Sequence, residues 1–156
     1  MTNKEVLSIF QTRHSTREYL DKMVSQEDIE TVLEAANLAP KGMNRKASHF
    51  YVFKKGEEKY QKLVDFAIKQ IGDNPFYEAP VIILATIDTS IAVTPIQDSS
   101  VAMENMLLAG CLLGLGTCWI NSVSFFFDQK NLDFLASLGV NKNYKVVASC
   151  ILGYKK

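Results

Sequence analysis

The sequence predicts one compact domain in which helices are layered on a β-sheet. Its 156 residues suit a single domain, and no linker, internal repeat or low-complexity tract divides them. Segments with helical and with strand character alternate along the chain, which is typical of αβ layer structures. Apolar residues make up 47% of the chain, which argues against disorder. We therefore expect residues 1–156 to form one domain.

The first two helices are predicted by apolar spacing and by a capping signal. Residues 4–12 place apolar side chains on one side of a helix, and the polar, basic residues 13–17 that follow form a loop. Ser25 and Asp28 are spaced as a variant of the capping box, and apolar residues recur at helical intervals after them. This helix ends before the segment 40–46, which is a second loop because it contains a proline and a glycine.

The middle of the chain predicts two strands that flank a helix. Residues 49–54 are aromatic and β-branched, as in a short strand, and residues 57–71 have the pattern of a charged amphipathic helix. Residues 80–87 form an apolar run, which predicts a central strand that is covered on both faces.

The last third of the chain predicts a buried helix followed by strand, helix and strand. Residues 98–114 are apolar nearly all round a helix, so this helix must lie inside the structure. The uncharged stretch of residues 106–120, which begins in this helix and runs into the next strand, is too short for a bilayer span of roughly 20 residues. A strand over 117–120, an amphipathic helix over 128–138 and a closing strand over 144–154 complete the chain.

Charge and motif content exclude several classes of function. The 17 basic and 17 acidic residues cancel, so no large positive field attracts nucleic acid or an anionic membrane. Two histidines and three cysteines have no metal-ligand spacing, so we expect no metal site and interpret the cysteines as buried thiols in a reducing compartment. No P-loop, G-x-S-x-G or G-x-G-x-x-G motif is present. The N-terminal stretch lacks a signal-peptide core, which favours a cytoplasmic protein.

Two loops concentrate the groups that could bind a ligand. The loop 13–17, RHSTR, offers guanidinium groups, hydroxyls and backbone amides to a phosphate-bearing ligand, although an exposed loop with solvated charges has the same composition. The second loop contains Asn44, whose amide can donate and accept at the edge of a flat heterocycle, or can stand in an ordinary helix-ending turn. The aromatic run 125–127 either fills the core or roofs a pocket.

Four stretches, in order and spacing, resemble the nitroreductase family of flavin-dependent NAD(P)H oxidoreductases. They are RHSTREY, APKGMNRKASHFYVF, DSSVAMENMLLAGCLLGLGTCWI and ILGY, and the resemblance covers nearly the whole chain. It implies an α+β fold in which a mainly antiparallel central sheet is wrapped by helices. It also implies a homodimer with FMN at the subunit interface and with the long apolar helix at the core of the dimer.

The resemblance implies that one group of residues holds the phosphate end of FMN. Arg13 and Ser15 would bind the phosphate, and His14 would contribute mainly through its backbone. Arg17 would lie by the N1 and O2 edge of the flavin, where its charge would stabilise the anion of reduced FMN. Family members often carry a later arginine that closes on the phosphate. In this sequence, Lys155 and Lys156 either supply the positive charge of that arginine or are solvated residues at the end of the chain.

The resemblance assigns the flavin ring to two further segments. The other subunit would line the ring and ribityl chain with residues of the second loop, namely Pro40, Lys41, Gly42 and Asn44. Asn121 and Ser122 match the position where a backbone amide faces flavin N5. Lys46 and Ala47 replace the glutamine and proline that often follow the loop asparagine, so recognition of the ring edge differs from the usual pattern.

The implied function is an FMN-dependent NAD(P)H oxidoreductase. NADH or NADPH would reduce FMN and leave, and an acceptor such as a nitroaromatic, a quinone or an enone would then bind over the same ring face. No catalytic side-chain acid or base is needed, because hydride arrives and leaves at N5. The alternatives are a flavin-binding carrier or regulator without turnover, and a specialised reductive dehalogenase. The sequence leaves the choice between NADH and NADPH open, and also the choice of acceptor.

Overall fold

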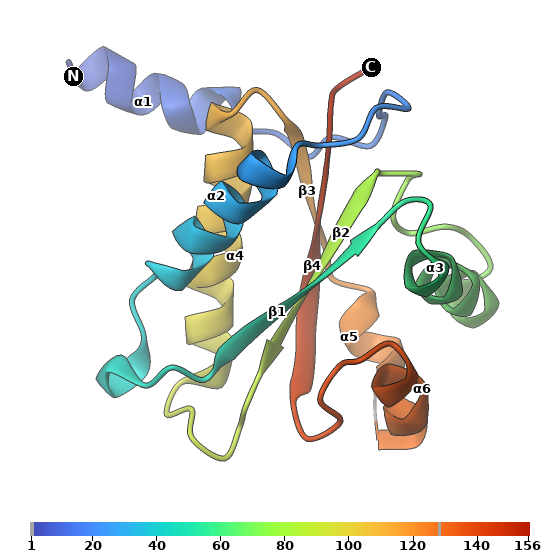
Figure 1. Cartoon of the computed structure of the whole chain (residues 1–156). Helices are drawn as coiled ribbons and strands as arrows, with labels where there is room; N and C mark the ends of the chain where they lie inside the picture. The colour runs from blue at the N-terminus through green and yellow to red at the C-terminus, as the bar shows by residue number, and fades with distance from the viewer. Residues whose placement is uncertain (1, 128) are drawn as a thin grey trace.

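The computed structural model describes residues 2–127 and 129–156 and shows a four-stranded sheet between two groups of helices (Figure 1). Its strands are β1 (Ser48–Lys54), β2 (Val81–Ile87), β3 (Gly116–Ile120) and β4 (Lys145–Gly153). Their order across the sheet is β1-β2-β4-β3, and each neighbouring pair is antiparallel. The expected antiparallel sheet wrapped by helices is confirmed.

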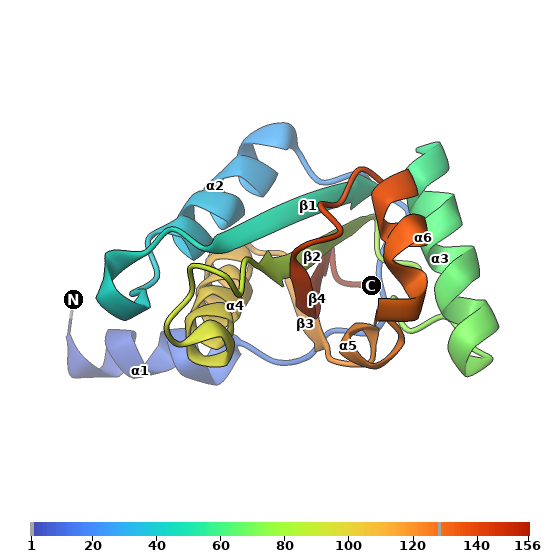
Figure 2. The same ribbon diagram turned by 90° about the horizontal axis from the view of Figure 1, so that it is seen from below.

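The helices cover the two faces of the sheet (Figure 2). One face carries α1 (Asn3–Thr12), α2 (Gln26–Asn37) and α4 (Pro95–Leu112). The other carries α3 (Glu58–Ile71), α5 (Val123–Phe126) and α6 (Leu132–Ser137). Two short 3₁₀ helices, η1 (Gly42–Asn44) and η2 (Gln129–Asn131), lie in loops. The predicted N-terminal cap of α2 is formed by Ser25, whose hydroxyl accepts a hydrogen bond from the Asp28 N–H at 3.0 Å.

The central strand β2 is buried on both faces, as its apolar run predicts. Successive side chains of a strand point to opposite faces of a sheet. Ile82 and Leu84 accordingly join the core under α3, whereas Val81 and Ile83 join the core under α2 and α4. All four side chains are 0% exposed. The single apolar strand β2 thus contributes side chains to the cores on both faces of the sheet.

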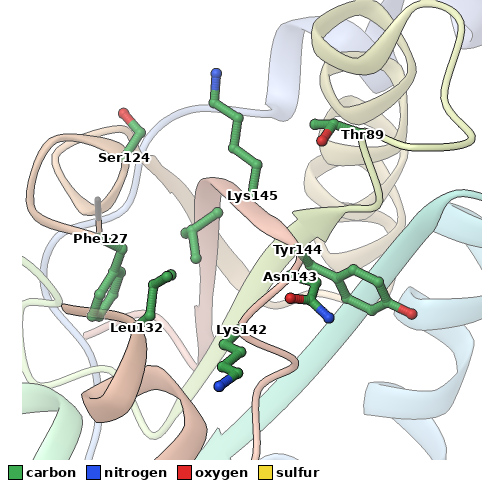
Figure 3. A pocket seen from close by; sticks show the side chains of 9 residues that line it. Thr89, Ser124, Phe127, Leu132, Lys142, Asn143, Tyr144 and Lys145 are labelled. Carbon is green, nitrogen blue, oxygen red and sulfur yellow. The ribbon is translucent and has the colours of Figure 1, made fainter. Parts of the chain in front are cut away.

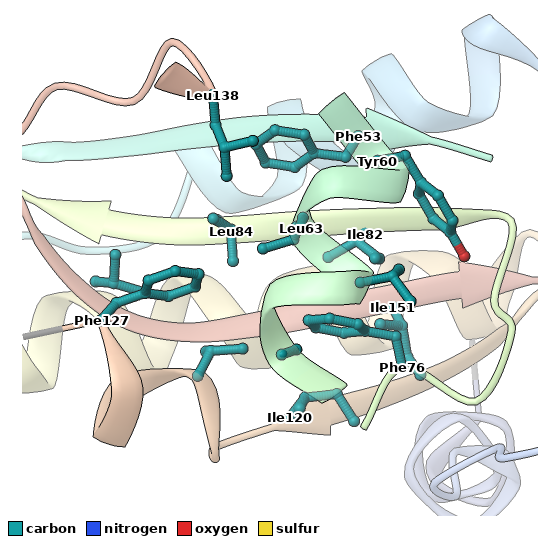
Figure 4. Close-up of a cluster of buried hydrophobic side chains, with 14 of the residues drawn as sticks. Phe53, Tyr60, Leu63, Phe76, Ile82, Leu84, Ile120, Phe127, Leu138 and Ile151 are labelled. Carbon is teal, nitrogen blue, oxygen red and sulfur yellow. The ribbon is translucent and has the colours of Figure 1, made fainter. Parts of the chain in front are cut away.

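The core under α3 is rich in aromatic rings (Figure 4). Phe126 and Phe127 are buried in it, and Phe66 stacks on Phe127 with ring centroids 5.5 Å apart. Phe125, the first ring of the same run, is 76% exposed. Tyr60 donates to the Ala79 carbonyl at 2.7 Å, and its burial raises the pKa of the phenol to about 12. The aromatic run therefore serves mainly as core.

Two elements differ from the sequence prediction. The long helix begins at Pro95 rather than Asp98, because proline is accommodated in the first helical turn, where its missing N–H has no helical partner to lose. The helix predicted over 128–138 is divided into η2 and the short α6, and α5 precedes them. Its predicted first residue, Asp128, lies outside the described residues. The buried rings of the aromatic run belong to α5 and to the residue after it, so a helix forms earlier than predicted.

Helices α1 and α4 lie side by side and present apolar side chains to solvent (Figures 1 and 2). No residue of α1 is buried. The long helix α4 buries one face against the sheet and exposes the other, which only partly meets the expectation that it lies inside. We use the name α1–α4 surface for the exposed apolar side chains of these two helices, which include Leu7, Phe10, Ile96, Val101 and Leu112. No helix in the described part of the chain is long and apolar enough to cross a bilayer.

Gly110 allows α4 to pack closely on the sheet. A Cβ atom there would lie 2.5 Å from Thr117 Cγ2 and 3.2 Å from Leu152 Cδ2, so a larger residue forces the helix or the sheet to move. Glycine within a helix costs about 1 kcal/mol relative to alanine. The close contact explains why the helix contains it.

We predict that Gly110→Ala lowers the free energy of unfolding by about 1–3 kcal/mol, because overpacking outweighs the gain in helix propensity. Thr117→Ser removes the clashing methyl group and keeps the hydroxyl that donates to the Leu107 carbonyl at 3.2 Å. The double variant should therefore recover most of the loss. Urea unfolding at a fixed protein concentration measures both effects, and an unchanged stability in Gly110→Ala would contradict the packing argument.

Candidate functional site

The loop 13–17 is anchored to the outer edge of β3. Ser15 forms a parallel bridge with Thr117, and the Thr16 N–H donates to the Thr117 carbonyl at 2.9 Å. Gly116 makes this approach possible, because a Cβ atom there would lie 2.6 Å from Thr16 Cγ2. Thr16 is buried, whereas Arg17 is exposed. The loop thus combines a fixed main chain with side chains that are free to meet a ligand.

The guanidinium groups of this loop have no acidic partner in the described part of the chain. Neither Arg13 nor Arg17 forms an ion pair with another residue that the structure describes. The Arg17 guanidinium lies over the Tyr77 ring, 5.7 Å from its centroid. His14 is exposed, and its Nδ1 lies 3.1 Å from the Thr12 carbonyl oxygen. Uncompensated guanidinium groups on an anchored main chain fit an anionic group such as a phosphate.

The last strand brings the C-terminal lysines to the same loop. Tyr19 forms an antiparallel bridge with Lys155, and the Lys156 N–H donates to the Glu18 carbonyl at 3.3 Å. The Tyr19 hydroxyl donates to the Thr16 carbonyl at 2.6 Å, and burial raises the pKa of this phenol far above its ordinary value. Tyr19 therefore remains a donor and ties the loop to the end of the chain.

The turn formed by Asn121 and Ser122 lies at the other end of β3. The Asn121 carbonyl accepts from the Ser124 hydroxyl at 2.8 Å, and the Asn121 side chain accepts from Trp119 Nε1 at 3.4 Å. Four residue steps separate Asn121 from Thr117, which corresponds to about 13 Å along a strand. The loop 13–17 and this turn therefore lie along one strand, at its two ends.

The second loop has a constrained backbone. Met43 and Asn44 both have left-handed conformations, with φ values of 52° and 55°. Lys41 turns back onto α2, where its ammonium group donates to the carbonyls of Asn37 and Ala39, the latter at 2.9 Å. Pro40 is exposed. This loop stands at the far end of α2 from the loop 13–17 (Figure 1), and the 12 residues of α2 span about 18 Å.

Asp98 holds the second loop in place, and sequence reasoning did not identify it. Its Oδ1 accepts from the Gly42 N–H at 2.9 Å and from the Thr94 hydroxyl at 2.8 Å. The residue is only 5% exposed, and its Oδ2 has no hydrogen-bond partner among the described residues. The available signal was an acidic residue in the first turn of an otherwise apolar helix, where a carboxylate also interacts well with the helix dipole.

A pocket of about 540 Å³ opens next to the Asn121–Ser122 turn (Figure 3). It is lined by residues from four separate segments: Thr89, Ser124, Phe127, Leu132, Lys142, Asn143, Tyr144, Lys145 and Val146. Its volume lies in the range of small-molecule sites. Sequence reasoning missed this pocket, because its walls come together only in the folded chain.

Cys118 and Cys150, which are further candidates for a chemical role, are buried in the core. Cys118, which could be proposed as a nucleophile, is 2% exposed. Burial also raises the pKa of the Cys150 thiol, which keeps it protonated. Within the described residues, no group of three or more histidine, cysteine, aspartate or glutamate side chains could hold a metal ion.

Comparisons with known proteins agree with this fold. The model of the nitroreductase family matches residues 10–154. An Archaeoglobus fulgidus protein, provisionally named NADH dehydrogenase/NAD(P)H nitroreductase, is 35% identical over 98% of this chain and 87% of its own length. A crystal structure of a Bacteroides fragilis nitroreductase with bound FMN is 30% identical, with a TM-score of 0.86 over 99% of this chain and 90% of that one.

A second FMN-bound nitroreductase structure, from Desulfitobacterium hafniense, is 26% identical to this chain. It superposes with a TM-score of 0.82 over 100% of this chain and 91% of that one. The sequence match extends through the loop 13–17, the second loop, the helix α4 and the strand β4. The chain therefore belongs to the nitroreductase family, a family of oxidoreductases.

Proposed function

We propose that the protein is an FMN-dependent oxidoreductase that transfers hydride from NADH or NADPH to an acceptor in two alternating half-reactions. The supporting observation is that, in a chain of this family, an anchored loop with two guanidinium groups without acidic partners and the turn at Asn121 lie at opposite ends of β3. FMN, when bound, supplies a ring that accepts and donates hydride at N5. Nitroaromatics and quinones are the proposed acceptors.

The residues along β3 fit the two ends of FMN. Arg13 and Ser15, assisted by Lys155 or Lys156, would bind the phosphate with hydrogen bonds from charged donors. The Asn121–Ser122 turn would offer a backbone N–H to the ring. The roughly 13 Å between the two ends of β3 is a span that an extended ribityl chain can bridge. The protein thus binds and orients, and no side chain has to exchange a proton with the ring.

Arg17 would control the charge of the reduced cofactor. A reduced flavin carries negative charge near N1, and a guanidinium group beside it stabilises that charge. Arg17 is exposed and has no carboxylate partner among the described residues, so its charge is available.

The second loop implies a site shared by two chains. It stands at the end of α2 that lies away from the loop 13–17 of its own chain. A homodimer would place it beside the partner's FMN. The α1–α4 surface is the proposed contact, because neighbouring exposed apolar side chains such as Phe10, 56% exposed, and Leu112, 63% exposed, favour burial against a second copy.

Anaerobic mixing of the FMN-loaded protein with NADH or NADPH tests the function. We expect rapid loss of the oxidised flavin absorbance and its return when a quinone is added. Arg17→Ala should slow reduction on the order of 100-fold, because a stabilising charge is lost. His14→Ala is the matched control, since its proposed role uses the main chain. Wild-type protein that binds FMN without being reduced would instead be a flavin carrier.

Asp98→Ala should weaken FMN binding by about 10-fold or more, because the Gly42 N–H loses a charged acceptor and the strained loop is released. Asp98→Asn retains an oxygen at the same position and should bind nearly as well as wild type. Quenching of FMN fluorescence measures both affinities. Equal affinities for wild type and Asp98→Ala would show that the second loop does not need this contact.

Phe10→Glu should convert the dimer into a monomer that binds FMN poorly, because a buried carboxylate opposes association. Phe125→Glu is the control, since Phe125 is 76% exposed but lies on α5, on the other face of the sheet. Light scattering during gel filtration gives the mass of each variant. A wild-type monomer that binds FMN would disprove the shared site.

A further inference from the structure

We propose that the pocket beside the Asn121–Ser122 turn binds electron acceptors that carry an anionic group, and that Lys145 selects them. This inference rests on the proposed function, because the pocket can hold an acceptor only if the flavin ring lies against that turn. It goes further by naming the class of acceptor, which is an aromatic ring bearing a carboxylate or a similar anion.

The pocket exists because β3 and β4 differ in length. The last pair between them joins Ile120 to Ser149, whereas β4 begins at Lys145. The first residues of β4 therefore have no strand beside them on that edge. The chain turns away at Asn121, and α5 and α6 close the space with Phe127 and Leu132. The turn assigned to the flavin ring and the rim of the pocket are consecutive in the chain.

A hydrogen bond links this turn to the pocket wall. The Ser124 hydroxyl, which lines the pocket, donates to the Asn121 carbonyl at 2.8 Å. The wall therefore moves together with the turn. A molecule in the pocket would therefore lie on the side of the turn that Ser124 faces, beside a ring held at Asn121.

The lining predicts the chemistry of the ligand. Phe127 and Val146 are nearly fully buried and, with Leu132, form an apolar floor that suits an aromatic ring. Lys142 and Lys145 supply positive charge, and none of the lining residues that the structure describes is acidic. Neither lysine forms an ion pair with another described residue. A cationic concave surface of this kind attracts anions and raises their local concentration.

The two lysines are not equivalent. In Figure 3, Lys145 extends toward the side of the pocket where Ser124 and Thr89 lie, whereas Lys142 extends toward the opposite side. Because Ser124 is bonded to the Asn121 turn, Lys145 is on the side of the proposed flavin ring. Lys145 is therefore the residue assigned to the acceptor's anion, and Lys142 provides a matched control.

The proposed reaction balances with the groups already named. A nitroaromatic acceptor takes one hydride and one proton from water, loses one oxygen as water and becomes the nitroso compound. NADH or NADPH is the reductant and is oxidised to NAD⁺ or NADP⁺. The carboxylate on the ring is not changed and serves only for binding.

The experiment compares 4-nitrobenzoate with its neutral methyl ester as acceptors for the FMN-loaded enzyme. Wild type should have the higher kcat/KM for 4-nitrobenzoate, and raising the ionic strength should reduce this preference. Lys145→Met should lower kcat/KM for the anion by roughly 10-fold and leave the ester within about twofold, because the apolar stem remains while the charge is lost. Lys142→Met should change both acceptors little.

Three results would overturn the proposal: equal kcat/KM values for the two acceptors in wild type, an equal loss for both in Lys145→Met, or an effect of Lys142→Met as large as that of Lys145→Met. Anaerobic reduction of FMN by NADH is measured first, without an acceptor. If that step fails, the proposed function fails separately. Equilibrium dialysis of 4-nitrobenzoate against wild type and Lys145→Met then decides whether the pocket binds the anion.

Discussion

The close approach of three segments to β3 is the constraint on which the rest of the structure depends. On one edge, β4 pairs with β3, and on the other edge the main chain of the loop 13–17 bonds to Thr117. On the face of the sheet, Gly110 brings α4 within contact of the same threonine. Because Thr117 contacts both α4 and the loop 13–17, the long helix, the sheet and this loop have fixed relative positions.

The candidate site combines a rigid strand and main chain with side chains that can change conformation. Strand β3 sets the separation between the loop 13–17 and the turn at Asn121, so the proposed FMN would meet both ends in a fixed geometry. Arg17 is exposed and Arg13 half-buried on an anchored main chain, so both side chains have room to adapt to a ligand. The second loop has strained backbone and is held by one buried carboxylate, Asp98. Strain of this kind persists where surrounding contacts hold it.

The two faces of α4 have different surroundings, and this difference links the folding of one chain to the proposed homodimer. One face completes the core under α2, and the other joins α1 in an apolar surface that the single chain leaves open. An apolar face without a partner is a cost in water, and a second copy of the chain removes it. The second loop is positioned at the far end of α2, where the same association would bring it to the partner's site. Association and completion of the site are therefore one event in this proposal.

The sequence by itself determined the strands and most of the helices, the antiparallel fold through the family resemblance, and the residues of the two loops, but not the division of residues 123–137 into α5, η2 and α6. These features follow from local spacing, capping and motifs, and the buried run Val81–Ile87 is the clearest case. Only the tertiary structure decided the contacts of Asp98 and the pocket around Lys145, on which the proposals for these residues rest. Asp98 acts on a loop 56 residues earlier, and the pocket at Lys145 arises from the unequal ends of two paired strands. Contacts between distant segments leave no periodic signal in a single sequence, because they depend on how the elements pack.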